Sequence, residues 1–145
     1  AAIRLTEALL TIALKEATAQ QDAGLIYKGL ADPAVSRVIN AVLKEPNKDW
    51  DLQDMVDIAH VCRSALNSRF TASVGMSPRH FVNHVRLTRA SEMLTDTTLS
   101  IATIAERTNY SSEAAFNRAF RKWCGMTPGA MRDAAISQNG RQLKH

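Results

Sequence analysis

The sequence predicts an all-α fold in which a pair of short helices occurs twice, with a long helix between the two pairs. Apolar residues recur at helical spacing through most of the chain. The pattern that begins at Leu52 is repeated from Ile101, and the segment between them, from Pro78 to Leu94, has helical spacing of its own. A length of 145 residues with 46% hydrophobic residues fits one ordinary globular domain, or a small domain with part of another.

The first 31 residues predict a helical remnant followed by a linker. Apolar residues at helical spacing in 3–19 indicate an amphipathic helix whose partner surface belongs to a longer protein. The chain begins Ala-Ala-Ile-Arg, without Met and without a signal-peptide pattern, so we interpret its start as a cut edge or a processed terminus. Gly24 and Gly29 mark the linker in 20–31.

A second helix is expected to begin at Asp32 and Pro33, which suit the cap and the first position of a helix. The turn that follows Pro46 holds Trp50, which we expect to fill the core beside it. The apolar face of this helix consists of Val35, Val38, Ile39, Val42 and Leu43.

The helices that follow form an internal repeat. The number of positions between matched residues of the two copies rises from 49 in the first helix to 50 in the second, so one residue is inserted in the turn between them. An insertion in a turn leaves both helices intact, and two copies of one structural unit are therefore predicted. At an offset of 49, Leu52, Met55, Val56, Ala59, His60 and Val61 match Ile101, Ile104, Ala105, Thr108, Asn109 and Tyr110. At an offset of 50, Leu66, Asn67, Phe70, Gly75, Met76, Ser77 and Pro78 match Phe116, Asn117, Phe120, Gly125, Met126, Thr127 and Pro128.

Local signals in the second copy predict a helix-turn-helix. Asn109 tolerates the left-handed backbone of a sharp turn, and Ser112 follows as a helix cap with acidic Glu113 in the first turn. Gly125 ends the second helix and Pro128 starts another. The expected elements are helix-turn-helix units at about 52–73 and 101–123, a linking helix at about 78–94, a C-terminal helix Pro128–Ile136 and a flexible tail at 138–145.

The net charge of +4 arises entirely after residue 50, because residues 1–50 contain six basic and six acidic side chains. No acid occurs between Asp57 and Glu92. Such a basic segment favours a polyanion, most simply nucleic acid, although a solvated surface has the same composition. The arginines of this segment are Arg63, Arg69, Arg79, Arg86 and Arg89.

The second helix of the second copy has a polar outer face of a kind that reads DNA. Arg and Asn side chains reach guanine and adenine edges in a major groove. The outer face carries Glu113, Ala114, Asn117, Arg118 and Arg121.

The linking helix spans about 25 Å at 1.5 Å per residue. With its flanks it approaches the roughly 34 Å between successive major grooves.

Other classes of function have weaker signals. No run of about 18 apolar residues is present to span a membrane, and two cysteines fit a reducing cytoplasm rather than a disulfide framework. No glycine-rich phosphate loop or nucleophile elbow suggests an enzyme or a cofactor. The open alternatives are a metal site or a DNA-facing polar stripe at His60, Cys62, His80 and His84, and a redox role for Cys62 and Cys124.

Residues 32–135 resemble the DNA-binding domain of AraC/XylS-type bacterial transcription regulators. The most specific part of the resemblance is the series Arg86-Leu87, Ala90, Ile101, Ile104-Ala105, Asn109-Tyr110, Phe116, Phe120 and Gly125-Met126-Thr127-Pro128. The resemblance implies seven helices, with the DNA-binding domain at 32–137 and recognition helices at about Arg63–Ser73 and Ser112–Lys122. It also implies that residues 1–30 end a sensor domain, often a cupin-like barrel.

The resemblance assigns residues to two roles. Ser68 departs from the family pattern, which often has Arg there, and this shifts base reading in the first helix toward Arg63 and Asn67. His60 and Asn109 replace turn glycines, and Met131 replaces an aromatic residue. The base-facing residues are Arg63, Ser64, Asn67, Ser68, Glu113, Ala114, Asn117 and Arg118. The phosphate-binding residues are Arg69, Arg79, Arg86, Arg89, Ser112 and Arg121.

Two functions follow as hypotheses. The first is a sequence-specific binder of double-stranded DNA that regulates transcription in the bacterial cytoplasm, at the nucleoid, with RNA polymerase as second partner. Its full-length form would respond to an effector and form a homodimer. The second is a basic helical module that binds an acidic protein without reading DNA.

Overall fold

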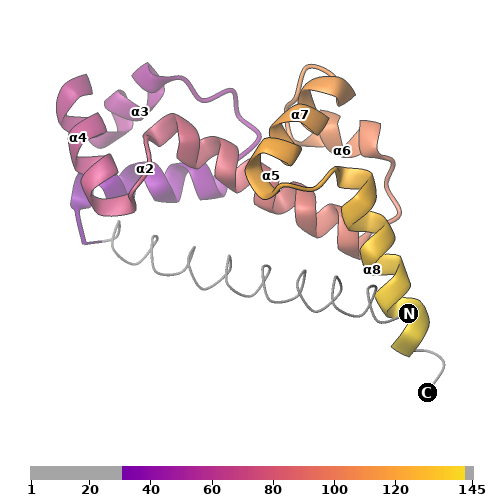
Figure 1. The fold of residues 1–145 in the computed structure, drawn as a ribbon. Coiled ribbons are helices and arrows are strands. Elements are labelled where there is room, and N and C mark those ends of the chain that lie inside the picture. The colour runs from indigo at the N-terminus through magenta and orange to yellow at the C-terminus, as the bar shows by residue number, and fades with distance from the viewer. Residues whose placement is uncertain (1–30, 143–145) are drawn as a thin grey trace. The chain divides into compact units, whose positions relative to one another are not determined.

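The computed structural model describes residues 31–142 and contains seven α-helices and no strand over that span. The helix expected at 3–19, the linker up to residue 30 and residues 143–145 lie outside the described part of the chain. The predicted all-α class is confirmed (Figure 1). The helices are α2 (Pro33–Lys44), α3 (Leu52–Ala59), α4 (Arg63–Val74), α5 (Pro78–Asp96), α6 (Ile101–Arg107), α7 (Glu113–Cys124) and α8 (Pro128–Gln142).

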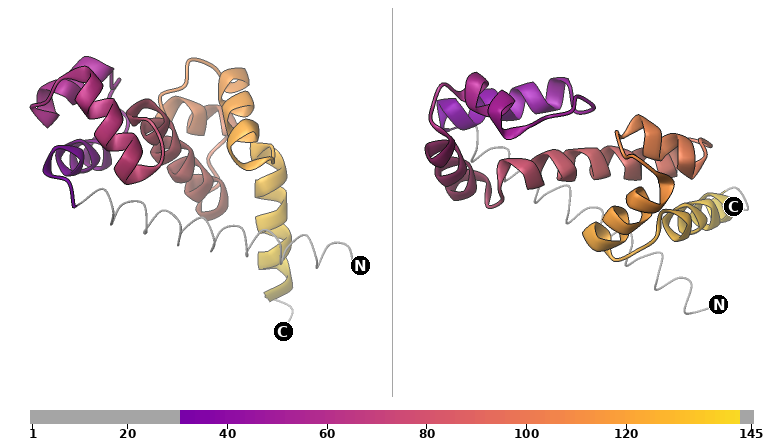
Figure 2. Two further views of the ribbon diagram at one scale, coloured as in Figure 1. Left: turned by 60° about the vertical axis from the view of Figure 1, so that its left-hand side comes forward. Right: turned by 90° about the horizontal axis from the view of Figure 1, so that it is seen from above.

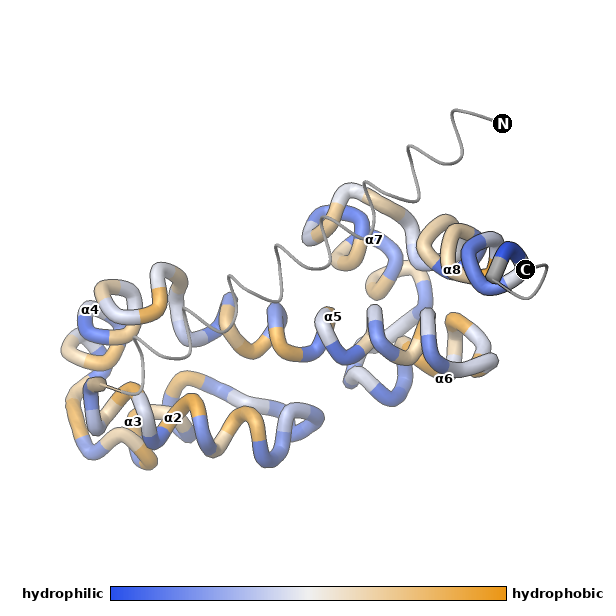
Figure 3. The backbone as a smooth tube through the Cα atoms, turned by 90° about the horizontal axis from the view of Figure 1, so that it is seen from below, coloured by the Kyte–Doolittle hydropathy of each residue, from blue (hydrophilic) through white to orange (hydrophobic). Residues whose placement is uncertain are grey.

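The described residues form two compact units that divide between Val85 and Arg86, inside the long helix α5. We call residues 31–85 the first unit and residues 86–142 the second unit. Hydrophobic and hydrophilic residues alternate along α2 and α5 (Figure 3), as expected for helices with one face in a core. The N-terminal part of α5 therefore contributes to the core of the first unit, and its C-terminal part to that of the second.

In the first unit, α2 packs against both α3 and α4 (Figure 2). Asp32 caps α2, because its Oδ1 accepts hydrogen bonds from the amides of Ala34 and Val35. Trp50 packs against the core and its Nε1 donates to the carbonyl of Glu45 over 2.7 Å, in agreement with its predicted place. The core consists of Ala34, Val35, Val38, Ile39, Val42, Met55, Ala59, Leu66, Phe70, Val74, Phe81, Val82 and Val85.

In the second unit, the core is more aromatic. The rings of Phe116 and Phe120 have centroids 5.6 Å apart, and Trp123 lies 5.6 Å from Phe120 in an edge-on arrangement. Edge and tilted contacts of this kind are favourable beyond the area that they bury. The buried members are Leu87, Ala90, Leu94, Ile104, Ala105, Phe116 and Phe120.

The backbone repeats as the sequence predicts. His60 and Asn109, which match at an offset of 49, both adopt left-handed φ values, 58° and 62°. Gly75 and Gly125, which match at an offset of 50, end α4 and α7 with φ values of 83° and 80°. A left-handed C-cap is cheap only for glycine, and a left-handed turn is tolerated by Asn and His, so the repeat extends to backbone conformation.

Two helices are longer than expected. The helix predicted to end at Leu94 continues to Asp96, and the helix predicted to end at Ile136 continues to Gln142. The expected end at Ile136 is the last apolar residue before the polar stretch 137–142, yet the backbone stays helical beyond it although Ile136 is 62% exposed. Helical hydrogen bonds form within the segment and do not require a packed face, so residues 138–142 are helical where a flexible tail was expected.

Candidate nucleic-acid interface

The second helix of each helix-turn-helix, α4 or α7, has one face in a core and one face in solvent; we call these two the recognition helices. Leu66, Phe70 and Val74 hold α4 in the first core, while Phe116 and Phe120 hold α7 in the second. Buried aromatic and aliphatic side chains in one row orient a helix about its axis. The polar residues between them therefore have a defined outward direction.

The recognition helices begin differently. Ser112 caps α7, because its Oγ accepts a hydrogen bond from the amide of Ala115 over 3.0 Å. Cys62 occupies the equivalent position of α4 and makes no side-chain cap bond. Its Sγ lies 3.5 Å from Ser64 Oγ, and this hydrogen bond lowers the pKa of the Cys62 thiol. Ser112, which was predicted to bind phosphate, thus uses its hydroxyl oxygen as the N-cap of α7.

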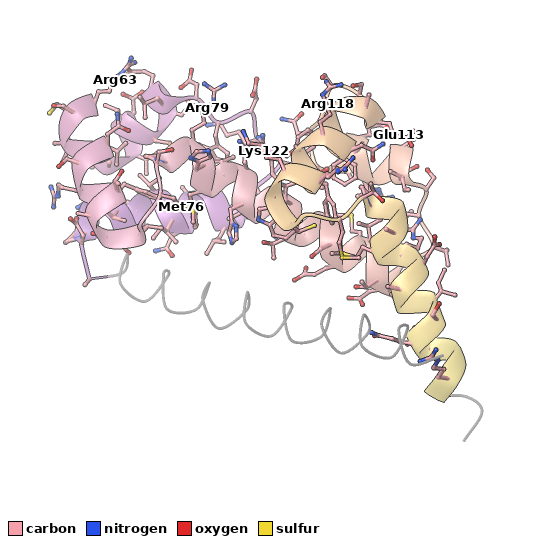
Figure 4. All side chains as sticks on the ribbon, in the orientation of Figure 1. Arg63, Met76, Arg79, Glu113, Arg118 and Lys122 are labelled. Carbon is pink, nitrogen blue, oxygen red and sulfur yellow. The ribbon has the colours of Figure 1, made fainter. Side chains whose placement is uncertain are left out.

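The outer face of α7 holds the base-facing residues predicted for the second copy. Glu113, Ala114 and Arg118 are exposed, and Asn117 is half-buried. Arg118 points outward from α7 in Figure 4, and Glu113 stands at the start of the same helix. Arg121 is exposed on the following turn. The structure therefore gathers these five residues on one helix.

The outer face of α4 has shorter side chains. Arg63, Ser64, Asn67 and Ser68 are all exposed, so the four base-facing residues predicted for the first copy also share one accessible face. Arg63 is the only one of the four with a charge. Two serines offer a hydroxyl to either kind of base edge and discriminate less than Arg or Asn.

Arg69 behaves differently from the other predicted phosphate-binding residues. Its Nε and Nη2 each donate to a different carboxylate oxygen of Asp32, at 2.8 Å in both cases. This pairing is bidentate and lowers the pKa of Asp32. A phosphate must compete with that carboxylate, so the geometry gives Arg69 a role in tying α4 to the start of α2.

Two further arginines donate hydrogen bonds to backbone carbonyls of other segments. Arg37 donates to the carbonyl of Ala59 at the end of α3, over 3.1 Å. Arg132 on α8 donates to the carbonyls of Leu94 and Thr97, over 3.2 and 3.4 Å. Both satisfy carbonyl groups left open at helix ends. The sequence pattern did not single out either residue, because its charge is indistinguishable from that of the solvated arginines.

Arg86 is half-buried on α5 and close enough to Tyr110 to oppose the rise in that residue's pKa that burial causes. This position suits a contact inside the second unit more than a phosphate contact. The remaining predicted arginines are exposed, and their guanidinium groups bond to no residue of 31–142: they are Arg63, Arg79, Arg89, Arg118 and Arg121.

One basic residue was missed by the sequence reasoning. Lys122 is exposed in the last turn of α7, next to Arg121, and Figure 4 labels its side chain. The sequence contained a signal for this residue, because Arg121 and Lys122 are two adjacent basic residues in one helical turn. A lysine in that place supplies charge to a phosphate but no base-specific geometry.

The histidines and cysteines do not assemble into a cluster. Within 31–142, no three His, Cys, Asp or Glu side chains are placed to hold one metal ion. Cys62 is exposed in the first unit and Cys124 is half-buried in the second, where burial raises the pKa of its thiol. No described helix has the length and apolarity needed to cross a membrane.

Comparison with known proteins decides the family. A helix-turn-helix domain family matches residues 55–134. This chain belongs to the AraC-type helix-turn-helix family. It is 36% identical over 104 residues to a putative AraC-like transcription regulator of Streptomyces lividans, and 34% identical over 107 residues to the HTH-type transcriptional regulator MtrA of Neisseria gonorrhoeae. These alignments cover 72% and 74% of the chain but 34% and 36% of the relatives, so the chain spans about a third of their length.

Solved AraC-type structures share the fold. The DNA-binding domain of AdpA, in complex with a target DNA, superposes with a TM-score of 0.68 at 24% identity, covering 74% of this chain and 96% of that one. The C-terminal domain of AraT, a response regulator from Geobacillus stearothermophilus, has a TM-score of 0.65 at 29% identity, covering 70% and 84%. The fold expected from the resemblance is thereby confirmed.

Proposed function

We propose that this AraC-type chain is the DNA-binding part of a bacterial transcription regulator that recognises a specific sequence in double-stranded DNA. The observation that carries the proposal is that each recognition helix has its apolar side in a core and presents on its other side an arginine without a partner among the described residues, Arg63 on α4 and Arg118 on α7. Guanidinium groups held this way are available for guanine edges and phosphates.

The exposed residues divide by chemistry into two roles. Side chains on the outer faces of α4 and α7 read bases, since a recognition helix enters the major groove with its N-terminal residues first. Exposed basic residues on α5 and in the last turn of α7 bind phosphates. Base reading is assigned to Arg63, Ser64, Asn67, Ser68, Glu113, Ala114, Asn117 and Arg118, and phosphate binding to Arg79, Arg89, Arg121 and Lys122.

Two recognition helices in one chain suit a site with two motifs. In helix-turn-helix proteins that read two half-sites on one face of DNA, the half-sites lie about 10 base pairs apart. We therefore propose that α4 and α7 enter successive major grooves of one operator. The resemblance extends the proposal to RNA polymerase as second partner, to an effector-binding or dimerising segment in the complete protein, and to action in the cytoplasm at the nucleoid.

The test is selection of bound fragments from random double-stranded DNA, with wild type and Arg118→Ala in parallel. Arg118→Ala should weaken binding by about 1–3 kcal/mol and relax the preference at one position of the site, because one bidentate base contact is lost. The matched control is Arg141→Ala, which removes one exposed charge near the end of α8. It should keep every base preference.

The outcomes separate the two candidate functions. Enrichment of one site by wild type, with steep loss of binding as salt rises, supports the DNA reading. Binding that is equally strong for cognate and scrambled DNA in wild type contradicts sequence specificity. In that event the basic module that binds an acidic protein becomes the better account.

A further inference from the structure

We propose that Glu113 determines the specificity of the second recognition helix by accepting a hydrogen bond from the N4 amino group of a cytosine in the major groove. This inference rests on the proposed function and deepens it, because it names the base that one residue requires. It starts from an electrostatic conflict. Glu113 is the only acidic residue on α4 or α7, and it stands on a face that otherwise meets a polyanion.

The carboxylate of Glu113 has no structural use within the described chain. It is exposed and makes no hydrogen bond or ion pair with any residue of 31–142. The contrast with α3 is informative. There, Asp54 occupies the third helical position and its Oδ2 accepts the amide of Asp51, completing a capping box. Glu113 occupies the first position of its helix and makes no such bond.

Interaction with the helix dipole is a second use that an acid at this position has. The other helices show that the fold does not depend on it. Neither α4 nor α6 has an acidic residue at its N-cap or in its first turn. The equivalent helix of the first unit has Arg63 where α7 has Glu113, and it forms nonetheless. A carboxylate that repels phosphate must therefore be offset by something that DNA supplies.

The groove supplies a restricted set of partners. A carboxylate only accepts hydrogen bonds, and cytosine presents a donating N4 amino group in the major groove. Guanine and thymine present acceptors there, O6 and N7 or O4, which repel a carboxylate, and adenine has its N6 donor beside the N7 acceptor, so cytosine is the base that a carboxylate suits best. Glu113 thus both selects cytosine and rejects its competitors, and the rejection costs more here because the nearby phosphates already disfavour the charge.

Arg118 complements this reading on the same helix. Arg118 lies five positions after Glu113, about 7.5 Å along the axis at 1.5 Å per residue. That rise is about two base-pair steps of 3.4 Å. The two side chains therefore contact different base pairs, Glu113 a cytosine and Arg118 a guanine. Substitutions at the two residues should change separate positions of the site.

The experiment selects sites from random double-stranded DNA with wild type, Glu113→Ala and Glu113→Gln. It then measures competition between probes that differ at the affected base pair. Glu113→Ala should lose a cytosine preference of about tenfold at one position. Glu113→Gln should replace that cytosine with adenine, because a glutamine amide pairs with adenine N6 and N7. A role in stabilising the helix cannot produce such an exchange of bases.

Glu106→Gln is the matched control, since Glu106 is an exposed glutamate on α6 of the same unit. It should strengthen binding to all probes and change no preference. Unchanged preferences at every position in both Glu113 variants would overturn the inference and leave the proposed function standing, as would an A·T or T·A pair in the wild-type site at the position that the variants change. A lowered melting temperature with an unchanged site would assign Glu113 to the helix dipole. If wild type enriches no site, the proposed function itself fails.

Discussion

Tyr110 has a hydroxyl oxygen that is buried without a hydrogen-bond partner among the described residues. Its ring packs against Phe116, with centroids 5.5 Å apart, so the aromatic part of the side chain contributes to the core of the second unit. Burial raises the pKa of Tyr110, and nearby Arg86 opposes that rise. A buried hydroxyl that has given up water without gaining a partner costs free energy. The second unit therefore contains one polar atom that works against its stability.

Replacing Tyr110 by Phe should leave the free energy of unfolding unchanged or raise it by up to about 1 kcal/mol, because the ring contact stays and the orphaned hydroxyl is removed. Urea denaturation of the two proteins measures the difference. A loss of stability beyond 1 kcal/mol would mean that the hydroxyl has a partner in solution.

At the same scale, the Asp32–Arg69 pair makes stability depend on acidity. The lowered pKa of Asp32 means that its charged form is favoured by folding, chiefly through the hydrogen bonds from Arg69. The contribution is present at pH values above the ordinary pKa of 3.8 and is lost as the pH falls through the lowered value. With 44% of the Arg69 side chain exposed, the pair contributes about 0.5–1 kcal/mol.

Asp32→Asn isolates this pair, because asparagine caps a helix about as well as aspartate but carries no charge. Wild type should exceed the variant by about 0.5–1 kcal/mol at pH 7, and the difference should disappear as the pH falls from 3.8 through the lowered pKa of Asp32. Thermal unfolding across pH checks it. A difference that persists at pH 2.5 would assign the effect to the cap instead of the ion pair.

At the scale of the helix, the two recognition helices differ most at their first residue. Ser112 gives α7 a side-chain cap, while Cys62 leaves the first turn of α4 without one. The backbone of Cys62 is already extended, with φ −70° and ψ 163°, as a cap residue requires. Only a side-chain acceptor for the amides of the first turn is lacking, so a substitution that supplies one should stabilise the start of α4.

Cys62→Ser should raise the free energy of unfolding by about 0.5–1 kcal/mol, and Ser112→Ala should lower it by about 1 kcal/mol. Chemical denaturation measures both changes, and helix content by circular dichroism shows whether the fold persists. Destabilisation by Cys62→Ser would indicate that the contact of the thiol with Ser64 matters more than the missing cap.

At the scale of the whole molecule, the described chain has two hydrophobic cores that share one helix, α5, divided between Val85 and Arg86. Phe70 and Phe120 occupy matching positions of the repeat, and both are fully buried. In the first core Phe70 meets the edge of Phe81 at 5.5 Å, whereas in the second Phe120 meets Phe116 and Trp123. Removal of either ring should therefore destabilise its own unit more than the other.

Phe70→Ala and Phe120→Ala should each cost about 3–5 kcal/mol, as expected for a large cavity in a packed core. Hydrogen exchange should show the greater loss of amide protection in 31–85 for Phe70→Ala and in 86–142 for Phe120→Ala. Equal loss across both units in either variant would show that the two cores unfold together.

Much of this architecture was predictable, because helix spacing, caps and turn residues act over a few neighbours. Asp32, Ser112, Gly75 and Gly125 mark their helix ends in the sequence as in the structure, and the repeat with its changing offset predicted two equivalent units. The candidate base-facing residues came from the family resemblance, and helical spacing agreed with it in giving Glu113, Ala114, Asn117 and Arg118 one outer face. The true end of α8 did not, because nothing packs there to leave an apolar signal.

By itself the sequence determined which segments are helices, which faces are apolar and where a positive charge accumulates. Tertiary structure alone decided what each charge does. Arg69 meets Asp32 across 37 positions of the chain, and Arg132 reaches the carbonyl of Leu94 across 38. Arg118 bonds to no described residue and faces solvent. Identical side chains bond within the fold or stay exposed according to long-range contacts, which no local pattern encodes.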